Sequence, residues 1–256
     1  MIDLPEPATA PNVTFVSAGP GAAAHLTLGA HRALQEAEVV IHDRLVGPEI
    51  LALIPGTARR IDMGKEGFGP SAAQSDINAT LVTEALTGAR VIRLKGGDCG
   101  IFGRLDEEID ALEAAGLTFA ILPGLTTAAV AAADIGQSLT RRGRNAALRI
   151  VTGHDMAGFA EQDWRAMARA GEVTAIYMGK KSARFIQGRL LMHGAAGTTV
   201  ATLVENVSRP DQRILSTNLA GLPDAAAQLT GPAVILLGLA PRHSQAALST
   251  LKEASR

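Results

Sequence analysis

Short apolar runs alternate along this chain with longer stretches whose apolar residues recur every three or four positions. The runs predict strands and the longer stretches predict helices. In the first half, strands are predicted at 13–17, 38–42, 58–63, 91–94 and 119–122, and helices at 25–37, 49–53, 77–86, 105–115 and 126–135. Strands that alternate with helices in this way are typical of a parallel sheet covered by helices.

The pattern changes near residues 138–147, which are polar and basic and lack a clear period. Beyond them, strands are predicted at 148–152, 173–178, 199–205, 212–216 and 233–237. Residues 206–211 are a plausible hairpin loop between two of these strands, so the second half is expected to contain a mixed sheet.

These patterns predict an α/β protein with two α/β domains, the first mainly parallel and the second mixed. The expected organisation is a flexible N-terminal tail at 1–12, a first domain at 13–137, a linker at 138–147, a second domain at 148–240 and a C-terminal tail at 241–256.

Composition excludes several classes of function. The 256 residues carry a net charge of −1 with one Trp and one Tyr, which argues against a nucleic-acid binder. No apolar run is long enough to span a membrane, and the N-terminus does not read as a secretory signal. The single Cys excludes an intrachain disulfide, and the six His form no ligand-spaced cluster, so no metal site is expected. We therefore expect a soluble, cytoplasmic protein.

The segment RVIRLKGGDCGIFGR at 90–104 carries the strongest local signal. Its apolar strand breaks into Gly96, Gly97 and Asp98. Adjacent glycines let a backbone approach a bound molecule closely, and in parallel α/β proteins ligands bind at the carboxyl ends of strands. A small-molecule site is expected here.

A second glycine motif leaves two alternatives open. Residues 19–24 fit the dinucleotide-binding pattern G-x-G-x-x-[GA], and Asp43 follows about 20 residues later, as an NAD(P)-dependent dehydrogenase requires. However, Pro20 removes a backbone donor that a pyrophosphate would use, and a tight turn explains the glycines equally well.

Taken together, the motifs resemble the tetrapyrrole methylases that use S-adenosylmethionine, and within them the uroporphyrinogen-III C-methyltransferases. The matching segments keep the family's order from about residue 13 to 240. They are VSAGPG (16–21), LTLGAHRALQEAEVVIHDRLV (26–46), MGK (63–65), INATLV (77–82), RVIRLKGGD (90–98), IFGR (101–104), LPGLTTA (122–128), SLTRRG (138–143), VTGH (151–154), YMGKK (177–181), VEN (204–206) and GPAVILLG (231–238).

The resemblance implies two α/β domains with the cofactor in the cleft between them, and a homodimer. It also implies methyl transfer from S-adenosylmethionine to C2 and C7 of uroporphyrinogen III. The products would be S-adenosylhomocysteine and precorrin-2, formed via precorrin-1, a precursor of sirohaem, cobalamin or haem d1.

Residue roles follow from the matching positions. The resemblance implies cofactor binding by Pro20, Gly96, Gly97, Asp98, Ile101, Thr126, Thr127, Met178, Pro232 and Ala233. It implies that Asp43 accepts a proton and that Lys65 donates one. It implies substrate binding by Arg104, Glu107, Arg142 and Met178, because uroporphyrinogen carries eight carboxylates that guanidinium groups can grip.

Purely structural roles are the alternatives: a rigid turn at Pro20, an ion pair at Asp43 and a solvated loop at Lys65. The family's Pro-Phe after GGD is Cys99-Gly100 here, which changes the loop beside the expected site. A methylase acting on a later precorrin or cobalt-precorrin, and a non-catalytic binder, remain competing hypotheses.

Overall fold

The computed structural model describes residues 10–64, 73–155 and 158–242. The chain divides into two units, one ending at Thr126 and the other beginning at Thr127. Each unit has its own sheet and its own apolar core.

The first unit is built on a five-stranded sheet in the order β3-β2-β4-β1-β5, and every neighbouring pair of strands is parallel. Its elements are β1 (Val13–Ser17), the 3-10 helix η1 (Ala23–His25), α1 (Leu28–Gln35), β2 (Val39–His42), α2 (Pro48–Leu51), β3 (Arg59–Asp62), α3 (Gln74–Ala85), β4 (Val91–Lys95), α4 (Leu105–Ala114) and β5 (Phe119–Leu122). The carboxyl ends of all five strands therefore meet at one edge.

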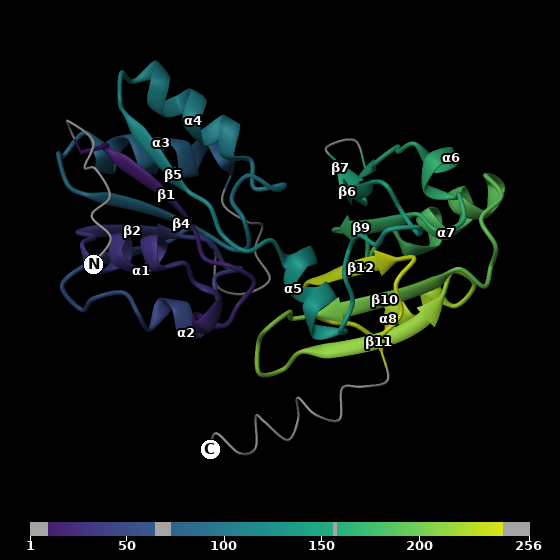
Figure 1. The fold of residues 1–256 in the computed structure, drawn as a ribbon. Helices are drawn as coiled ribbons and strands as arrows, with labels where there is room; N and C mark the ends of the chain where they lie inside the picture. Colours follow the sequence, from purple (N-terminus) through teal and green to yellow (C-terminus); the bar gives the residue numbers. More distant parts are fainter. Residues whose placement is uncertain (1–9, 65–72, 156–157, 243–256) are drawn as a thin grey trace, which may run out of the picture. The chain divides into compact units, whose positions relative to one another are not determined.

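Alternation along the central strand β4 explains how the helices cover this sheet. Ile92 and Leu94 join the core formed with α1 and α2, whereas Val91 joins the core on the other face, formed with α3 and α4. Figure 1 shows these two helix pairs on opposite sides of the sheet. Arg93 and Lys95 share the face of Val91, because side chains alternate along a strand.

The second unit contains a mixed five-stranded sheet in the order β11-β10-β12-β9-β6. Its elements are α5 (Thr127–Asp134), β6 (Leu148–Thr152), β7 (His154–Asp155), β8 (Gly158–Phe159), α6 (Trp164–Met167), β9 (Val173–Tyr177), α7 (Ala183–Met192), β10 (Val200–Glu205), β11 (Arg213–Asn218), α8 (Leu222–Ala227) and β12 (Ala233–Leu237). Strands β10 and β11 form the expected antiparallel hairpin. The predicted fold class, with one parallel and one mixed sheet, is confirmed.

Helix α5 shows where the chain divides. It packs on β12, and Val130 and Ala131 are buried in a core with Val234 and Leu236 of that strand. The division therefore falls before α5, whereas the sequence placed the linker after it at 138–147. An Ala-rich helix shows no preference for either sheet in its sequence, so its packing partner was not evident.

Helix ends differ from the predictions by a few residues. Helix α1 begins at Leu28 rather than 25, because the Thr27 hydroxyl caps it by accepting from the Ala30 N–H at 3.1 Å. Helix α3 begins at Gln74, three residues before the predicted apolar stripe. Within the described ranges, no helix is long and apolar enough to cross a membrane.

Candidate functional site

Two glycine turns meet at the carboxyl edge of the first sheet. Gly19, after β1, and Gly97, after β4, exchange backbone hydrogen bonds of 3.0 and 2.8 Å. Both have positive φ, +71° and +72°, which glycine adopts without steric cost. Gly96 approaches the next loop so closely that a Cβ there would lie 3.0 Å from the Leu45 carbonyl oxygen. These turns place the GPG and GGD segments side by side.

The residues after GGD tie this turn to its neighbours. The Asp98 carboxylate accepts from the Gly100 N–H at 2.8 Å and from the Gly124 N–H at 3.3 Å. The Cys99 N–H donates to the Ser17 hydroxyl at 3.0 Å, a bond that a proline at this position could not make. Burial raises the pKa of the Cys99 thiol, which favours a packing role over a nucleophilic one.

Asp43 stands at the same edge, directly after β2, where its N–H donates to the Leu94 carbonyl. Its side chain is 31% exposed, and Oδ1 accepts from Arg93 Nη2 at 2.6 Å. Its other carboxylate oxygen has no hydrogen-bond partner among the described residues. The ion pair expected as the structural alternative therefore exists, and it leaves one oxygen free.

Arg93 belongs to a group of four ionised side chains that we call the buried charge cluster: Asp43, Arg93, Lys95 and Glu108. Glu108 of α4 accepts from Arg93 Nε at 2.7 Å, from Arg93 Nη2 at 3.0 Å and from Lys95 Nζ at 2.5 Å. Arg93, Lys95 and Glu108 are 1%, 3% and 0% exposed. Two positive and two negative charges thus balance inside the first unit.

The charge on Arg93 is maintained by its partners. Burial alone disfavours the guanidinium, but the carboxylates of Asp43 and Glu108 outweigh that effect and raise the pKa of Arg93. Gln74 of α3 also contacts Glu108, at 3.5 Å. A buried charge is tolerated when it is paired and hydrogen-bonded in this way.

Arg104 and Glu107 form a second charged pair beside the cluster. Arg104 donates to Glu107 through Nε at 2.7 Å and through Nη2 at 2.6 Å, which is a bidentate ion pair. The hydrogen bond lowers the pKa of Glu107 and raises that of Arg104. Both side chains are exposed at the start of α4, where they are accessible to a ligand.

In the second unit, two predicted segments lie at one edge of the sheet. Met178 follows β9, and Pro232 and Ala233 stand at the start of β12, its antiparallel neighbour. Met178 is 50% exposed with φ of +52°. The Tyr177 hydroxyl accepts from the Ala128 N–H at 2.9 Å and so joins the start of α5 to β9.

The turn before β12 is held by a charged side chain on each side, which we call the turn clamp. Lys180 Nζ donates to the carbonyls of Thr230 and Gly231 at 2.8 and 2.7 Å. The buried carboxylate of Glu205 accepts from the N–H groups of the same two residues, at 2.6 Å from Thr230. The clamp fixes the backbone that leads into Pro232.

Backbone with a positive φ at non-glycine residues occurs in the loops that carry the family motifs. Among the described residues, the non-glycine positions with positive φ are Phe102, Arg104, Met178, Asn206 and Ser208. The first three lie in the IFGR and YMG segments, Asn206 ends the VEN segment, and Ser208 lies two residues beyond it. Such strain persists where the surrounding structure holds it, often at functional sites.

Comparison with known proteins decides the family. The model of the tetrapyrrole (corrin/porphyrin) methylases matches residues 12–223. The chain belongs to this family. The resemblance seen in the sequence is thereby confirmed.

Individual relatives of this tetrapyrrole methylase are also similar over most of its length. Siroheme synthase 3 of Aeromonas hydrophila is 42% identical over 226 residues, 88% of this chain and 48% of that protein. Siroheme synthase of Edwardsiella ictaluri is 43% identical over 88% of this chain and 49% of its own. The chain thus spans about half the length of the curated relatives it matches.

Among solved structures, uroporphyrin-III C-methyl transferase from Thermus thermophilus in complex with S-adenyl homocysteine has a TM-score of 0.76. It is 32% identical, over 88% of this chain and 91% of that one. A cobalt precorrin-4 methyltransferase has a TM-score of 0.78 at 22% identity, over 88% of this chain and 94% of that one, and shows the shared fold alone.

The structure gathers most of the predicted residues at one edge of their own sheet. In the first unit these are Pro20, Asp43, Gly96, Gly97, Asp98, Ile101, Arg104 and Glu107, and in the second Thr127, Met178, Pro232 and Ala233. Thr126 ends the first unit, and Arg142 is exposed in the loop after α5. Lys65 lies outside the described residues.

The dinucleotide alternative meets physical obstacles in this tetrapyrrole methylase. The N–H and C=O of Gly19 are already paired with Gly97. The Ala23 N–H, which a phosphate would need, donates to the Glu49 carboxylate at 3.0 Å. A carboxylate at this point repels a phosphate, which argues against a pyrophosphate site at residues 19–24.

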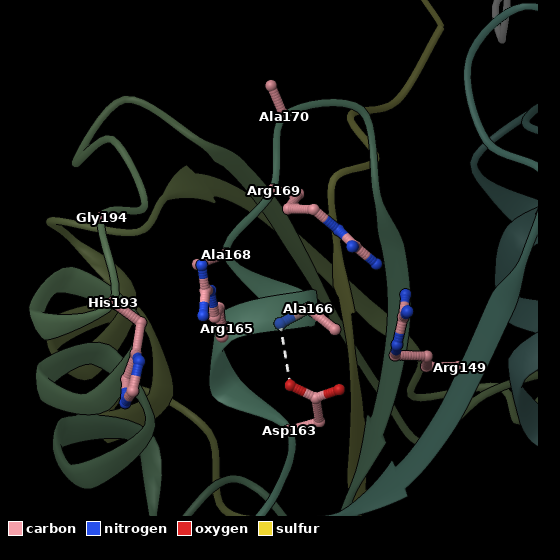
Figure 2. A pocket seen from close by; sticks show the side chains of 9 residues that line it. All are labelled: Arg149, Asp163, Arg165, Ala166, Ala168, Arg169, Ala170, His193 and Gly194. Atoms are coloured by element: carbon pink, nitrogen blue, oxygen red, sulfur yellow. Dashed lines mark hydrogen bonds between the residues drawn. The ribbon is translucent and has the colours of Figure 1, made fainter.

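A cavity of about 630 Å³ in the second unit contains none of the predicted residues (Figure 2). Its arginines include Arg149 and Arg169, which both pair with Glu172. Asp163 accepts from the Ala166 N–H and caps α6, as the dashed line in Figure 2 marks. These charges therefore have structural partners, and we assign the cavity no function.

Sequence reasoning missed the buried charge cluster and the turn clamp. Arg93 interrupts the apolar strand β4, Lys95 ends that strand, and Glu205 ends β10. A charged residue inside an otherwise apolar strand is the signal that could have found them, because such residues are rarely buried without a partner.

Proposed function

We propose that this tetrapyrrole methylase transfers methyl groups from S-adenosylmethionine to C2 and C7 of uroporphyrinogen III, giving precorrin-2 via precorrin-1. The observation that carries the proposal is the gathering of Asp43, the GGD turn and Arg104 at one sheet edge, in a fold shared with uroporphyrin-III C-methyl transferase. The names of the siroheme synthase relatives support the same tetrapyrrole chemistry.

The loops fit the cofactor. The GGD turn combines a positive φ at Gly97 with a close approach of Gly96 to the Leu45 loop. Ile101, Met178 and Pro232 offer partly or well exposed apolar surface. When bound, S-adenosylmethionine supplies the methyl group as an electrophile. The residues proposed to bind it are Pro20, Gly96, Gly97, Asp98, Ile101, Thr126, Thr127, Met178, Pro232 and Ala233.

The charged side chains have distinct proposed roles. Methylation places positive charge on the macrocycle, and that charge is discharged when a proton leaves a neighbouring carbon. The free oxygen of Asp43 can accept this proton, and such a transfer is commonly worth about 10²–10⁴-fold in rate. Lys65 is proposed as the proton donor.

Substrate carboxylates require cations. Arg104 is proposed to bind one carboxylate while Glu107 orients its guanidinium, and Arg142 to bind another. Most of the rate is expected to come from alignment of the methyl donor with the ring carbon.

The direct test is to incubate the purified protein with uroporphyrinogen III and S-adenosylmethionine. We expect a product two methyl groups heavier, with the absorbance of a dipyrrocorphin, and no product when the methyl donor is omitted. Unchanged uroporphyrinogen III would contradict the proposal. Methylation of a later precorrin instead would support the alternative substrate.

A further inference from the structure

The buried charge cluster is not explained by stability alone. Arg93, Lys95 and Glu108 are almost fully removed from water, and desolvation of such charges offsets much of their mutual attraction. Apolar side chains of similar volume often stabilise a protein equally well or better. The buried charge cluster therefore has a role other than stabilising the fold.

The hydrogen bonds of the cluster form a chain with one exposed end. Lys95 donates to Glu108 Oε1, Glu108 receives two bonds from Arg93, and Arg93 Nη2 reaches Asp43 Oδ1 at 2.6 Å. Only the last member is accessible, with 31% of the Asp43 side chain exposed. The three inner members thus form a fixed support beneath a single accessible carboxylate.

Two strands and a helix give this support its rigidity. Arg93 lies on the central strand β4, in register with Ile41 of β2 and Phe15 of β1. Glu108 lies in the first turn of α4, and Asp43 directly follows β2. Groups on packed elements hold a reactive atom more precisely than groups on loops do.

A guanidinium has its donors in one plane, so it orients the carboxylate that it binds. Because Glu108 occupies Arg93 Nε and shares Nη2, the position of the guanidinium is set before any ligand arrives. Oδ1 of Asp43 is then held, while its other oxygen has no hydrogen-bond partner among the described residues and 31% of the side chain is exposed. A carboxylate fixed in this way needs little reorganisation during proton transfer.

We propose that Arg93, clamped by Glu108, is the positioning residue for Asp43 and sets the orientation of its free carboxylate oxygen for proton transfer. This inference rests on the proposed function, in which Asp43 accepts the proton. Lys95 completes the support by neutralising Glu108.

A double-mutant cycle tests the inference. The variants are Arg93→Lys, which keeps the charge but loses the planar fork, Asp43→Asn, and the two combined. We expect Asp43→Asn to lower kcat about 100-fold and Arg93→Lys about tenfold. The double variant should match Asp43→Asn, because Arg93 acts only through Asp43.

Two further measurements separate positioning from a structural role. In Arg93→Lys, the KM for uroporphyrinogen III and the Kd for S-adenosylhomocysteine should stay within about twofold of wild type, since only the transition state is affected. Glu108→Gln changes a residue that contacts Arg93 but not Asp43, and it should also lower kcat. This variant replaces Arg93→Lys in the test if Arg93→Lys does not fold. Arg149→Gln, which breaks a partly buried ion pair elsewhere, is the control and should keep kcat unchanged.

The outcomes are distinct. An Arg93→Lys effect as large in the Asp43→Asn background as in wild type would overturn the inference, as would a wild-type kcat in both Arg93→Lys and Glu108→Gln. Either result leaves the proposed function standing. A wild-type kcat in Asp43→Asn would instead remove the proton-accepting role of Asp43, and this inference with it.

Discussion

At the scale of single residues, Glu108 is the carboxylate that both buried cations of the cluster share. It is fully buried on α4 and accepts three hydrogen bonds from two cations. The sequence shows Glu107 and Glu108 as two adjacent acidic residues at a helix start, where either suits the helix dipole. Their different surroundings, one exposed and one enclosed, come from the orientation of the helix, which no local pattern predicts.

Replacement of Glu108 by Ala should therefore destabilise the protein strongly. Lys95 would lose its carboxylate partner and Arg93 would keep only Asp43. Loss of one partner of a buried pair costs about 3–5 kcal/mol. Glu113→Ala, on the exposed face of the same helix, should change the free energy of unfolding by less than about 0.5 kcal/mol. The midpoints of urea unfolding measure both, and equal midpoints would show that Glu108 is not essential to the core.

At the scale of elements, the turn clamp is the comparable feature of the second unit. Lys180 follows β9 and Glu205 ends β10, so the clamp joins two strands to the turn before β12. The side chains act on backbone groups, so this support depends on the turn's conformation rather than on its residue types.

The clamp leads to a prediction about cofactor binding. Lys180→Met should release the carbonyls of Thr230 and Gly231 and loosen the turn that carries Pro232. We expect the Kd for S-adenosylhomocysteine to rise about fivefold, since one hydrogen bond to a charged group contributes about 1.5–3 kcal/mol and part of it is recovered by water. Lys181→Met is the control, because the neighbouring Lys181 is exposed and outside the clamp. Calorimetry should show a weaker Kd only for Lys180→Met, and equal affinities would contradict the role of the clamp.

Elements were predictable from the sequence to a large extent. Strands such as β1, β5, β6 and β12 begin and end at the predicted residues, because each is a short apolar run bounded by turn residues. The first residues of α1 and α3 were not predicted correctly. A capping residue and a polar first turn do not contribute to the apolar stripe from which a helix is predicted. The glycine turns were located by the motif, but their pairing through Gly19 and Gly97 required the parallel register of β1 and β4.

At the scale of the whole molecule, the chain carries its predicted site residues on both units. Asp43, the GGD turn and Arg104 belong to the first, and Met178 and Pro232 to the second. Each unit has a separate apolar core. The family motifs located these loops, whereas the division before α5 depended on packing that the sequence did not reveal.

Ligand binding should accordingly stabilise the folded chain. At a concentration 100 times its Kd, S-adenosylhomocysteine contributes about 2.7 kcal/mol to folding. For a chain of this size we expect Tm to rise by roughly 5–10 °C. NADH at the same concentration should leave Tm unchanged, because Glu49 occupies the donor that a phosphate would need. Differential scanning calorimetry measures both, and a shift with NADH alone would contradict the family's cofactor.

The hydrogen bond from the Cys99 N–H to the Ser17 hydroxyl has a practical consequence for loop grafting. A transplanted Pro-Phe segment would bring a ring nitrogen that cannot donate, and the enclosed Ser17 hydroxyl would lose its donor. Positions 17 and 99 therefore form a compatibility pair, although they stand 82 residues apart in the chain. A chimera that exchanges this loop should exchange the end of the first strand together with it.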